Sequence, residues 1–201
     1  MSENANPTEP PVAGRTARSL WPLWLIIAIS VMPFVLAGLT YFLWQPEAKI
    51  NYGELIQTRP LPPARLQLAD GADFQLGQLS GKWILLMVDA GGCDEFCQRK
   101  LYTIRQLRLA QGKGMERIER VWLISDGVAP PAAVVSGYQG TWMVRAAGSE
   151  LLAQLPAKSA LADHIYVVDP LGNLVLRYPR DADPLKIIKD LTRLLKTSRI
   201  G

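Results

Sequence analysis

An uncharged, apolar run from Trp21 to Trp44 constrains this 201-residue chain more than any other feature. About 20 apolar residues are enough to cross the hydrocarbon core of a bilayer as a helix. The run is also longer than the apolar core of a cleaved signal peptide, which spans roughly 7–15 residues. We therefore predict an uncleaved transmembrane anchor over residues 21–44, with aromatic rings at both membrane–water interfaces.

Charges on either side of this run predict its orientation. Arg15 and Arg18 precede the run closely, whereas only Lys49 follows it closely. Because the more basic side of a span stays in the cytoplasm, we predict an inner-membrane, single-pass protein with a cytoplasmic N-terminus and a periplasmic C-terminal domain. Residues 1–20 are polar and proline-rich, so we expect a disordered tail there, and we assign residues 45–61 to a linker.

Residues 62–201 alternate between strand and helix patterns. Apolar and polar residues alternate over residues 64–79 around an Asp-Gly pair, as in a β-hairpin. The continuous apolar run over residues 83–90 is typical of a strand that is buried on both faces. The other predicted elements are a helix from Cys93 to Gly112, a strand over 121–126, a short strand within 140–146, a short helix within 149–155, a hairpin of 165–169 with 174–179, and an amphipathic helix over 184–196.

This order of elements predicts the fold class. A cysteine motif lies between the first core strand and the helix that follows it, and strands and helices continue to alternate beyond it. A sheet with helices on both faces and such a motif is the thioredoxin arrangement. We therefore predict an α/β chain, in which a thioredoxin-like domain over residues 62–201, with a central mixed sheet flanked by helices, follows one N-terminal transmembrane helix.

The two cysteines, Cys93 and Cys97, are four residues apart at the turn from strand to helix. On one helix face their Cβ atoms would be about 5–6 Å apart, whereas a disulfide requires about 3.5–4.5 Å. A disulfide therefore requires Cys93 to lie outside ideal helix geometry, which Gly91 and Gly92 permit. Two thiolates that share a metal ion have no such limit, and they suit Cu(I) or Zn. A structural disulfide, a redox pair and a metal clamp are all open at this point.

The two sulfurs are expected to differ. Cys97 shares a face with apolar helix residues and is expected to be the more buried, whereas Cys93 is expected at the exposed helix start, where N–H groups favour a thiolate. Asp94 and Glu95 lie between them and disfavour a thiolate, so they suit a bound cation better. Acidic residues are also common in the first turn of a helix because of the macrodipole.

His164 is the single histidine of the chain and lies at the entrance to the predicted strand 165–169. In a thioredoxin-like fold this edge of the sheet faces the cysteine turn, so Cys93, Cys97 and His164 can form a trigonal metal site. The alternative is an ordinary histidine at a strand end. Spacing alone favours that alternative, because one histidine is weak evidence for a metal ligand.

These motifs resemble the Sco/SenC family, whose members are thioredoxin-like, membrane-anchored proteins of cytochrome c oxidase assembly. The resemblance covers residues 62–196 and the anchor, and it is based on LSGKWILLMVDAGGC, CDEFC, VWLISD and DHIYVVDPLG. This chain is divergent, since Gln98 stands where family members usually have proline. The family binds copper through a C-x-x-x-C pair and a histidine, so the resemblance implies Cys93, Cys97 and His164 as Cu(I) ligands.

The resemblance implies an assembly factor that handles Cu(I), with a cytochrome c oxidase subunit or another copper protein as its client. One alternative is a thiol–disulfide oxidoreductase, in which Cys93 and Cys97 are catalytic and keep the copper-site cysteines of the partner reduced. A further alternative is a non-catalytic interaction domain with a structural disulfide. The net charge of +4 is spread without a basic run, so a nucleic acid is not expected as a partner.

Overall fold

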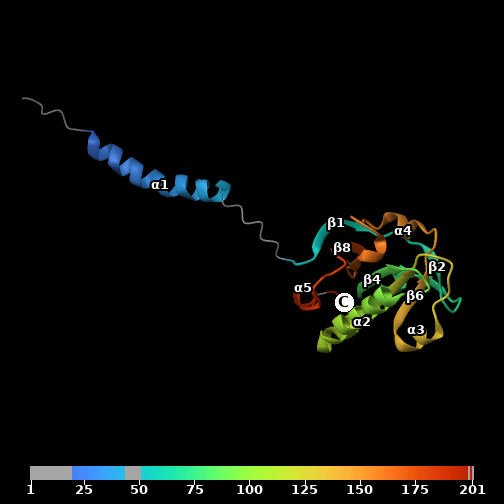
Figure 1. Ribbon diagram of the computed structural model, residues 1–201. Coiled ribbons are helices and arrows are strands. Elements are labelled where there is room, and N and C mark those ends of the chain that lie inside the picture. The colour runs from blue at the N-terminus through green and yellow to red at the C-terminus, as the bar shows by residue number, and fades with distance from the viewer. Residues whose placement is uncertain (1–19, 44–50, 199, 201) are drawn as a thin grey trace, which may run out of the picture. The chain divides into compact units, whose positions relative to one another are not determined.

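The computed structural model describes residues 20–43, 51–198 and 200, which comprise an N-terminal helix and a separate C-terminal domain (Figure 1). The helix, α1, spans Trp21–Leu43 and carries no charged residue. Its length and composition allow it to cross a membrane, and it coincides with the predicted anchor. Trp44 and most of the predicted N-terminal tail lie outside the described residues.

One eight-stranded mixed sheet forms the centre of the C-terminal domain. Its strands are β1 (Glu54–Pro60), β2 (Arg65–Leu68), β3 (Asp73–Gln75), β4 (Trp83–Asp89), β5 (Ile118–Ile124), β6 (Thr141–Arg145), β7 (Ile165–Val168) and β8 (Asn173–Tyr178). Their order in the sheet is β1-β8-β7-β4-β5-β6-β2-β3. Strands β4, β5 and β6 are parallel, and the other neighbouring pairs are antiparallel.

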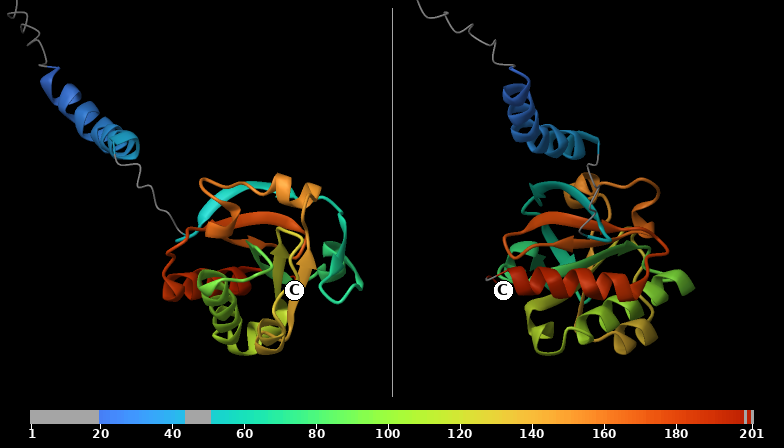
Figure 2. Two further views of the ribbon diagram at one scale, coloured as in Figure 1. Left: turned by 45° about the vertical axis from the view of Figure 1, so that its right-hand side comes forward. Right: turned by 90° about the vertical axis from the view of Figure 1, so that its left-hand side faces the viewer.

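Helices and short helical turns cover both faces of this sheet (Figure 2). They are α2 (Glu95–Leu109), α3 (Ala132–Gly137), α4 (Glu150–Gln154), α5 (Pro184–Thr197), and the 3-10 helices η1 (Leu76–Leu79), η2 (Gly112–Arg117) and η3 (Leu161–Asp163). Buried residues of α2, α3 and α5 belong to the core on one face, and those of η1 and α4 belong to the core on the other. The predicted thioredoxin-like arrangement is therefore confirmed.

Strand β4 explains why residues 83–90 are continuously apolar. All seven residues of β4 are buried, and the strand lies between β5 and β7. Side chains alternate between the faces of a sheet, so Leu85 and Met87 enter the core beneath α2 and α5, while Leu86 and Val88 enter the opposite core. Strand β4 therefore carries the cysteine turn at its carboxyl end on a rigid, doubly covered support.

Strand β1 lies within residues 45–61, for which the sequence predicts a linker. The structure instead pairs β1 with β8 at the edge of the sheet. Glu54 forms ion pairs of 2.7 Å with Arg177 of β8 and with Lys158. Most β1 side chains are exposed, so the strand has no alternating apolar pattern by which the sequence would reveal it. The folded domain therefore begins before residue 62.

Replacing Glu54 by glutamine tests how much these ion pairs stabilise the edge of the sheet. Arg177 and then Lys158 lower the pKa of Glu54 from 4.5 to about 2. Because this pKa is lower in the folded chain, the charged carboxylate stabilises the fold above pH about 4.5, and that contribution is lost as the pH falls towards about 2. The carboxylate side chain is 44% exposed, so solvent screening keeps the gain below about 1 kcal/mol.

We therefore expect Glu54→Gln to lower the free energy of unfolding modestly at neutral pH, and the difference from the wild type to shrink through the acid range. Urea unfolding curves at a series of pH values measure both effects. Glu116→Gln, at an exposed glutamate of η2, is the control. If the free energy of unfolding depends on pH in the same way in both variants, the ion pairs of Glu54 do not stabilise the fold.

Candidate functional site at the cysteine turn

The two cysteines lie where β4 ends and α2 begins, as the sequence predicts. Strand β4 ends at Asp89 and α2 begins at Glu95, so Cys93 precedes the helix and Cys97 lies in its first turn. The two cysteines form a disulfide, with their Cα atoms 5.0 Å apart. The structure thus satisfies the condition that the sequence sets for a disulfide, because Cys93 lies outside helix geometry.

The backbone of this turn is held by the loop that follows β5. Cys93 has a φ of 43° and is the one non-glycine residue with a positive φ in the described part of the chain. The N–H of Gly91 donates to Asp126 at 2.8 Å. A Cβ atom at Gly91 would lie 1.8 Å from the carbonyl oxygen of Val128, so only glycine fits this position. These contacts stabilise a conformation that is unfavourable for a side chain such as that of Cys93.

Two polar side chains close the turn from the helix side. Asp94 is the N-cap of α2, and its carboxylate accepts the N–H of Cys97 at 2.8 Å. The side-chain amide of Gln98 donates to the backbone carbonyl of Cys93 at 3.2 Å. The backbone carbonyl of Gln98 accepts a hydrogen bond from the hydroxyl of Tyr138. Asp94 therefore has the helix-capping role that acidic residues have in a first turn, and Gln98 ties that turn to the segment after α3.

Both cysteines are buried. Cys97 is fully buried and Cys93 is 3% exposed. The greater burial of Cys97 agrees with the prediction, whereas the predicted exposure of Cys93 is wrong. The turn brings Cys93 into the same core cluster that contains Cys97, between the sheet and α2.

A buried ion pair joins the ends of β4 and α2. The ammonium of Lys100 is 2.7 Å from the carboxylate of Asp89, and the two side chains are only 6% and 12% exposed. Lys100 also donates to the carbonyls of Val88 and Ala162, so it connects α2 to both β4 and η3. Burial lowers the pKa of Lys100, and the ion pair with Asp89 opposes that shift.

The sequence patterns above do not predict this ion pair. A signal was present, because Lys100 lies four residues before Ile104 on the apolar stripe of α2, and Asp89 lies at the end of an apolar strand. A lysine and an aspartate at those two positions are consistent with an ion pair beneath the helix. The pair fixes the first turns of α2 on β4 and therefore the position of Cys97.

His164 lies directly before β7 and is 5% exposed. Its Nδ1 is 3.1 Å from the carbonyl oxygen of Tyr178, so Nδ1 carries the proton and donates it. Its Nε2 lies 3.5 Å from the hydroxyl of Ser159. Among residues 20–43, 51–198 and 200, no group of three or more His, Cys, Asp or Glu side chains is arranged to hold a metal ion.

The three-ligand set that the sequence suggests is therefore not assembled in this structure. The sulfurs of Cys93 and Cys97 are bonded to each other, and the ring of His164 packs beside β8. Sequence spacing does not determine this outcome, because the position of His164 depends on the pairing of β7 with β8.

Phe96, between the two cysteines, has cationic neighbours. The guanidinium of Arg180 is 4.0 Å from the centre of the Phe96 ring, and Lys100 and Arg99 lie at 5.1 and 5.7 Å. Arg180 also pairs with Asp163, the residue before His164, at 2.6 Å. The Phe96 ring therefore connects the cysteine turn to the segment that carries the histidine.

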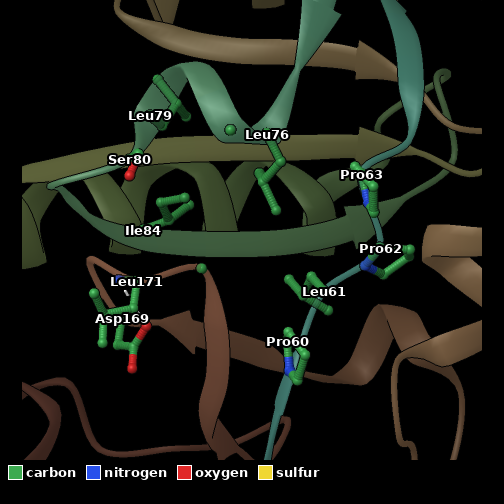
Figure 3. A pocket seen from close by; sticks show the side chains of 12 residues that line it. Pro60, Leu61, Pro62, Pro63, Leu76, Leu79, Ser80, Ile84, Asp169 and Leu171 are labelled. Carbon is green, nitrogen blue, oxygen red and sulfur yellow. Dashed lines mark hydrogen bonds between the residues drawn. The ribbon is translucent and has the colours of Figure 1, made fainter.

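The cavity in Figure 3 is separate from this site. It has a volume of about 160 Å³ and is lined by the segment around Pro62, by η1 and by the turn between β7 and β8. Strand β4 contributes Ile84, which lies near the opposite end of the strand from the cysteine turn. This cavity is therefore not part of the candidate site.

The fold and the cysteine turn define a thioredoxin-like domain with an intramolecular disulfide at the start of its first core helix. Residues 83–198 match the family model "Transmembrane-like, thioredoxin-like, C-terminal domain". The chain belongs to this family. None of the curated proteins matches it.

Solved structures with the same fold include Sco proteins. Copper-bound ScoI of Bradyrhizobium japonicum has a TM-score of 0.53 and 18% identity, over 67% of this chain and 99% of that chain. Copper-bound yeast Sco1 has a TM-score of 0.59 and 15% identity, over 69% of this chain and 94% of that chain. BsSco has a TM-score of 0.54 and 15% identity, over 73% of this chain and 98% of that chain. It is described as having a disulfide switch and as a member of the Sco family of cytochrome c oxidase assembly proteins. The fold of this chain is thus the fold of Sco proteins.

Replacing Lys100 by methionine tests the buried ion pair. The substitution leaves Asp89 as an unpaired charge in the core, so we expect the free energy of unfolding to fall by about 3 kcal/mol. The neighbouring Arg99 pairs with Glu95 at the surface, and Arg99→Met is expected to cost less than about 0.5 kcal/mol.

Urea unfolding of the oxidised chain, followed by tryptophan fluorescence, measures both variants. The double variant Asp89→Asn with Lys100→Met is expected to recover part of the loss, because it leaves no unpaired charge. Equal losses for Lys100→Met and Arg99→Met would show that the buried pair has no special role.

Proposed function

We propose that this chain assists cytochrome c oxidase assembly by dithiol–disulfide exchange, through Cys93 and Cys97, with the cysteines of a copper-site protein. The observation that carries the proposal is the disulfide between a cysteine in a turn and a cysteine in the first turn of α2. An oxidase subunit or another copper protein is the proposed client. The copper-bound Sco structures with this fold support that choice of client.

In the proposed reaction the reduced pair transfers two electrons to a disulfide of the partner. The thiolate of Cys93 attacks one partner sulfur, the partner S–S bond breaks, and the other partner sulfur leaves as a thiolate. Cys97, as a thiolate, then attacks the sulfur of Cys93 and displaces the second partner sulfur, also as a thiolate. The protons that Cys93 and Cys97 lose on ionisation go to the two partner thiolates. The product is a reduced partner and the Cys93–Cys97 disulfide.

The positions of the two sulfurs support different roles. Cys97 is fully buried on α2, which suits the resolving cysteine. Cys93 is in the turn and is the attacking cysteine in this proposal. Because Cys93 is 3% exposed in the oxidised chain, we expect the turn to open before a partner can reach it. The carboxylate of Asp94 accepts the N–H of Cys97 and holds the turn in place.

Binding of Cu(I) by the reduced pair is a second candidate function. Reduction would supply two thiolates, which are soft ligands suited to Cu(I). The Nδ1 of His164 donates to a backbone carbonyl, which leaves the lone pair on Nε2, as in histidines that bind metals. The oxidised structure itself does not fit the ion, because both sulfurs are bonded and His164 is not grouped with them.

The proposed location is the inner membrane, with α1 as a single anchor, a cytoplasmic N-terminus and the domain in the periplasm. The distribution of Arg15, Arg18 and Lys49 around the anchor supports this orientation. A disulfide also persists more readily in the periplasm than in the cytosol. The proposed organisation is a tail over residues 1–20, an anchor over 21–44 and a thioredoxin-like domain beyond.

Redox titration of the full chain in maltoside micelles tests the exchange reaction. We expect a reduction potential above about −300 mV, since structural disulfides that resist reduction lie below this value. With a disulfide-bonded copper-site peptide, Cys97→Ala is expected to accumulate a mixed disulfide through Cys93, and Cys93→Ala is not. A potential below that value, together with no trapped adduct, would leave only a structural disulfide.

Titration of the reduced chain with Cu(I) against a competing chelator tests the second candidate. If the thiolates bind the ion, Cys93→Ala and Cys97→Ala are both expected to abolish stoichiometric binding. His164→Ala is expected to weaken binding by at least about tenfold if Nε2 is a ligand. Equal binding by the wild type and the double cysteine variant would exclude Cu(I) binding at this pair.

A further inference from the structure

Arg120 of β5 is a second buried cation, and it lacks the pairing that Lys100 has. The residue is 5% exposed. Its Nη2 donates to the carbonyl of Gln139 at 2.8 Å, but its Nε and Nη1 are buried and find no hydrogen-bond partner within the described structure. Such unsatisfied buried donors are rare in folded proteins, and an ordered water or an ion can satisfy them.

Thr141 adds a third unsatisfied atom at the same place. Arg120 and Thr141 are paired in the register of β5 and β6, and directly paired residues point to the same face of a sheet. The hydroxyl of Thr141 is buried and also has no hydrogen-bond partner in the described residues. The guanidinium and the hydroxyl therefore offer unused donors on one face of neighbouring strands.

The surrounding charge favours an anion. Burial is the main cause that lowers the pKa of Arg120. The charges of Arg108 and Arg105 on α2 lower it further, so these two arginines add to the positive potential around Arg120. Glu119 opposes this shift, but its carboxylate accepts the indole N–H of Trp142 at 3.1 Å. Glu119 is also the neighbour of Arg120 in the strand, so it points to the opposite face. The buried guanidinium thus has no carboxylate partner on its own face in the described structure.

The turn that contacts Arg120 also lines a cavity. The cavity has a volume of about 240 Å³ and is lined in part by Gln139, Gly140 and Thr141. Gln139 and Gly140 are exposed, and Gly140 has a φ of 74°. A Cβ atom at Gly140 would lie 3.1 Å from Nη2 of Arg120, so the glycine lets the turn lie close to the guanidinium. Gln139 and Gly140 therefore contact the guanidinium of Arg120 and also line the cavity.

The geometry points to an oxyanion site between β5 and β6, in which Arg120 and Thr141 donate hydrogen bonds to a small anion such as inorganic phosphate or a carboxylate. Arg105 and Arg108 supply further positive charge. The site is distinct from the cysteine turn, because Arg105 lies about 12 Å beyond Cys97 along α2. It is also independent of the proposed exchange reaction.

Titration of the full chain in maltoside micelles, with inorganic phosphate in one arm and acetate in another, tests the site at constant ionic strength set by chloride. We expect saturable binding of one anion per chain by calorimetry, and a higher midpoint of thermal unfolding when the anion is present. Arg120→Met is expected to weaken binding by at least about tenfold, because it removes charged hydrogen bonds. Thr141→Val, which removes one neutral donor, is expected to weaken binding about three- to tenfold.

Arg65→Met, at an exposed arginine of β2, is the matched control and is expected to bind as the wild type does. Without anion, Arg120→Met is expected to be at least as stable as the wild type, because it removes an unpaired buried charge. If Arg120→Met does not fold, the affinity of Thr141→Val for the anion tests the site in its place. Tighter binding of phosphate or of acetate assigns the anion class. No saturable binding of either, or binding unchanged in both variants, overturns the site.

Discussion

All seven residues of β4 are buried, with alternate side chains in the two cores, and this double coverage determines how the rest of the domain is arranged. The strand ends at Asp89, where the carboxylate meets the ammonium of Lys100 from α2. A buried charge pair tolerates little displacement, because separating its partners would leave unpaired charges in the core. The pair therefore fixes α2 over the carboxyl end of β4, and the chain between the strand and the helix must turn sharply there. The disulfide lies in that turn.

The cysteine turn is compatible with two chemistries that differ in the state of the sulfurs. In the oxidised chain Cys93 takes a positive φ, both sulfurs are buried and no metal ligand set is assembled in the described residues. In a reduced chain the same two sulfurs would be available as nucleophiles or as soft ligands. The hydrogen bond from Nδ1 of His164 to Tyr178 sets the ring tautomer in advance, whichever chemistry applies. The redox state of one bond thus separates the two candidate functions.

Two buried cations on the same face of the sheet, Lys100 and Arg120, differ in their hydrogen-bond and ion-pair partners. Lys100 has a carboxylate partner and two carbonyl acceptors, so its charge is compensated within the fold. Arg120 has one carbonyl acceptor and two arginine neighbours. The first arrangement stabilises the site at the start of α2. The second leaves two guanidinium donors, Nε and Nη1, without a hydrogen-bond partner in the described residues.

The sequence by itself determined the features that depend on local composition and period. The apolar run defined α1, the continuous apolar segment defined β4, and the cysteine motif after it defined where the turn would lie. Only the tertiary structure decided that residues 54–60 form an edge strand, because mostly exposed side chains leave no period to detect. It also decided the burial of Cys93, the bond between the two sulfurs, the hydrogen bond of His164 to the carbonyl of Tyr178, and the contrast between Lys100 and Arg120. These features depend on contacts between segments far apart in the chain, and a local pattern of residue types carries no information about such contacts.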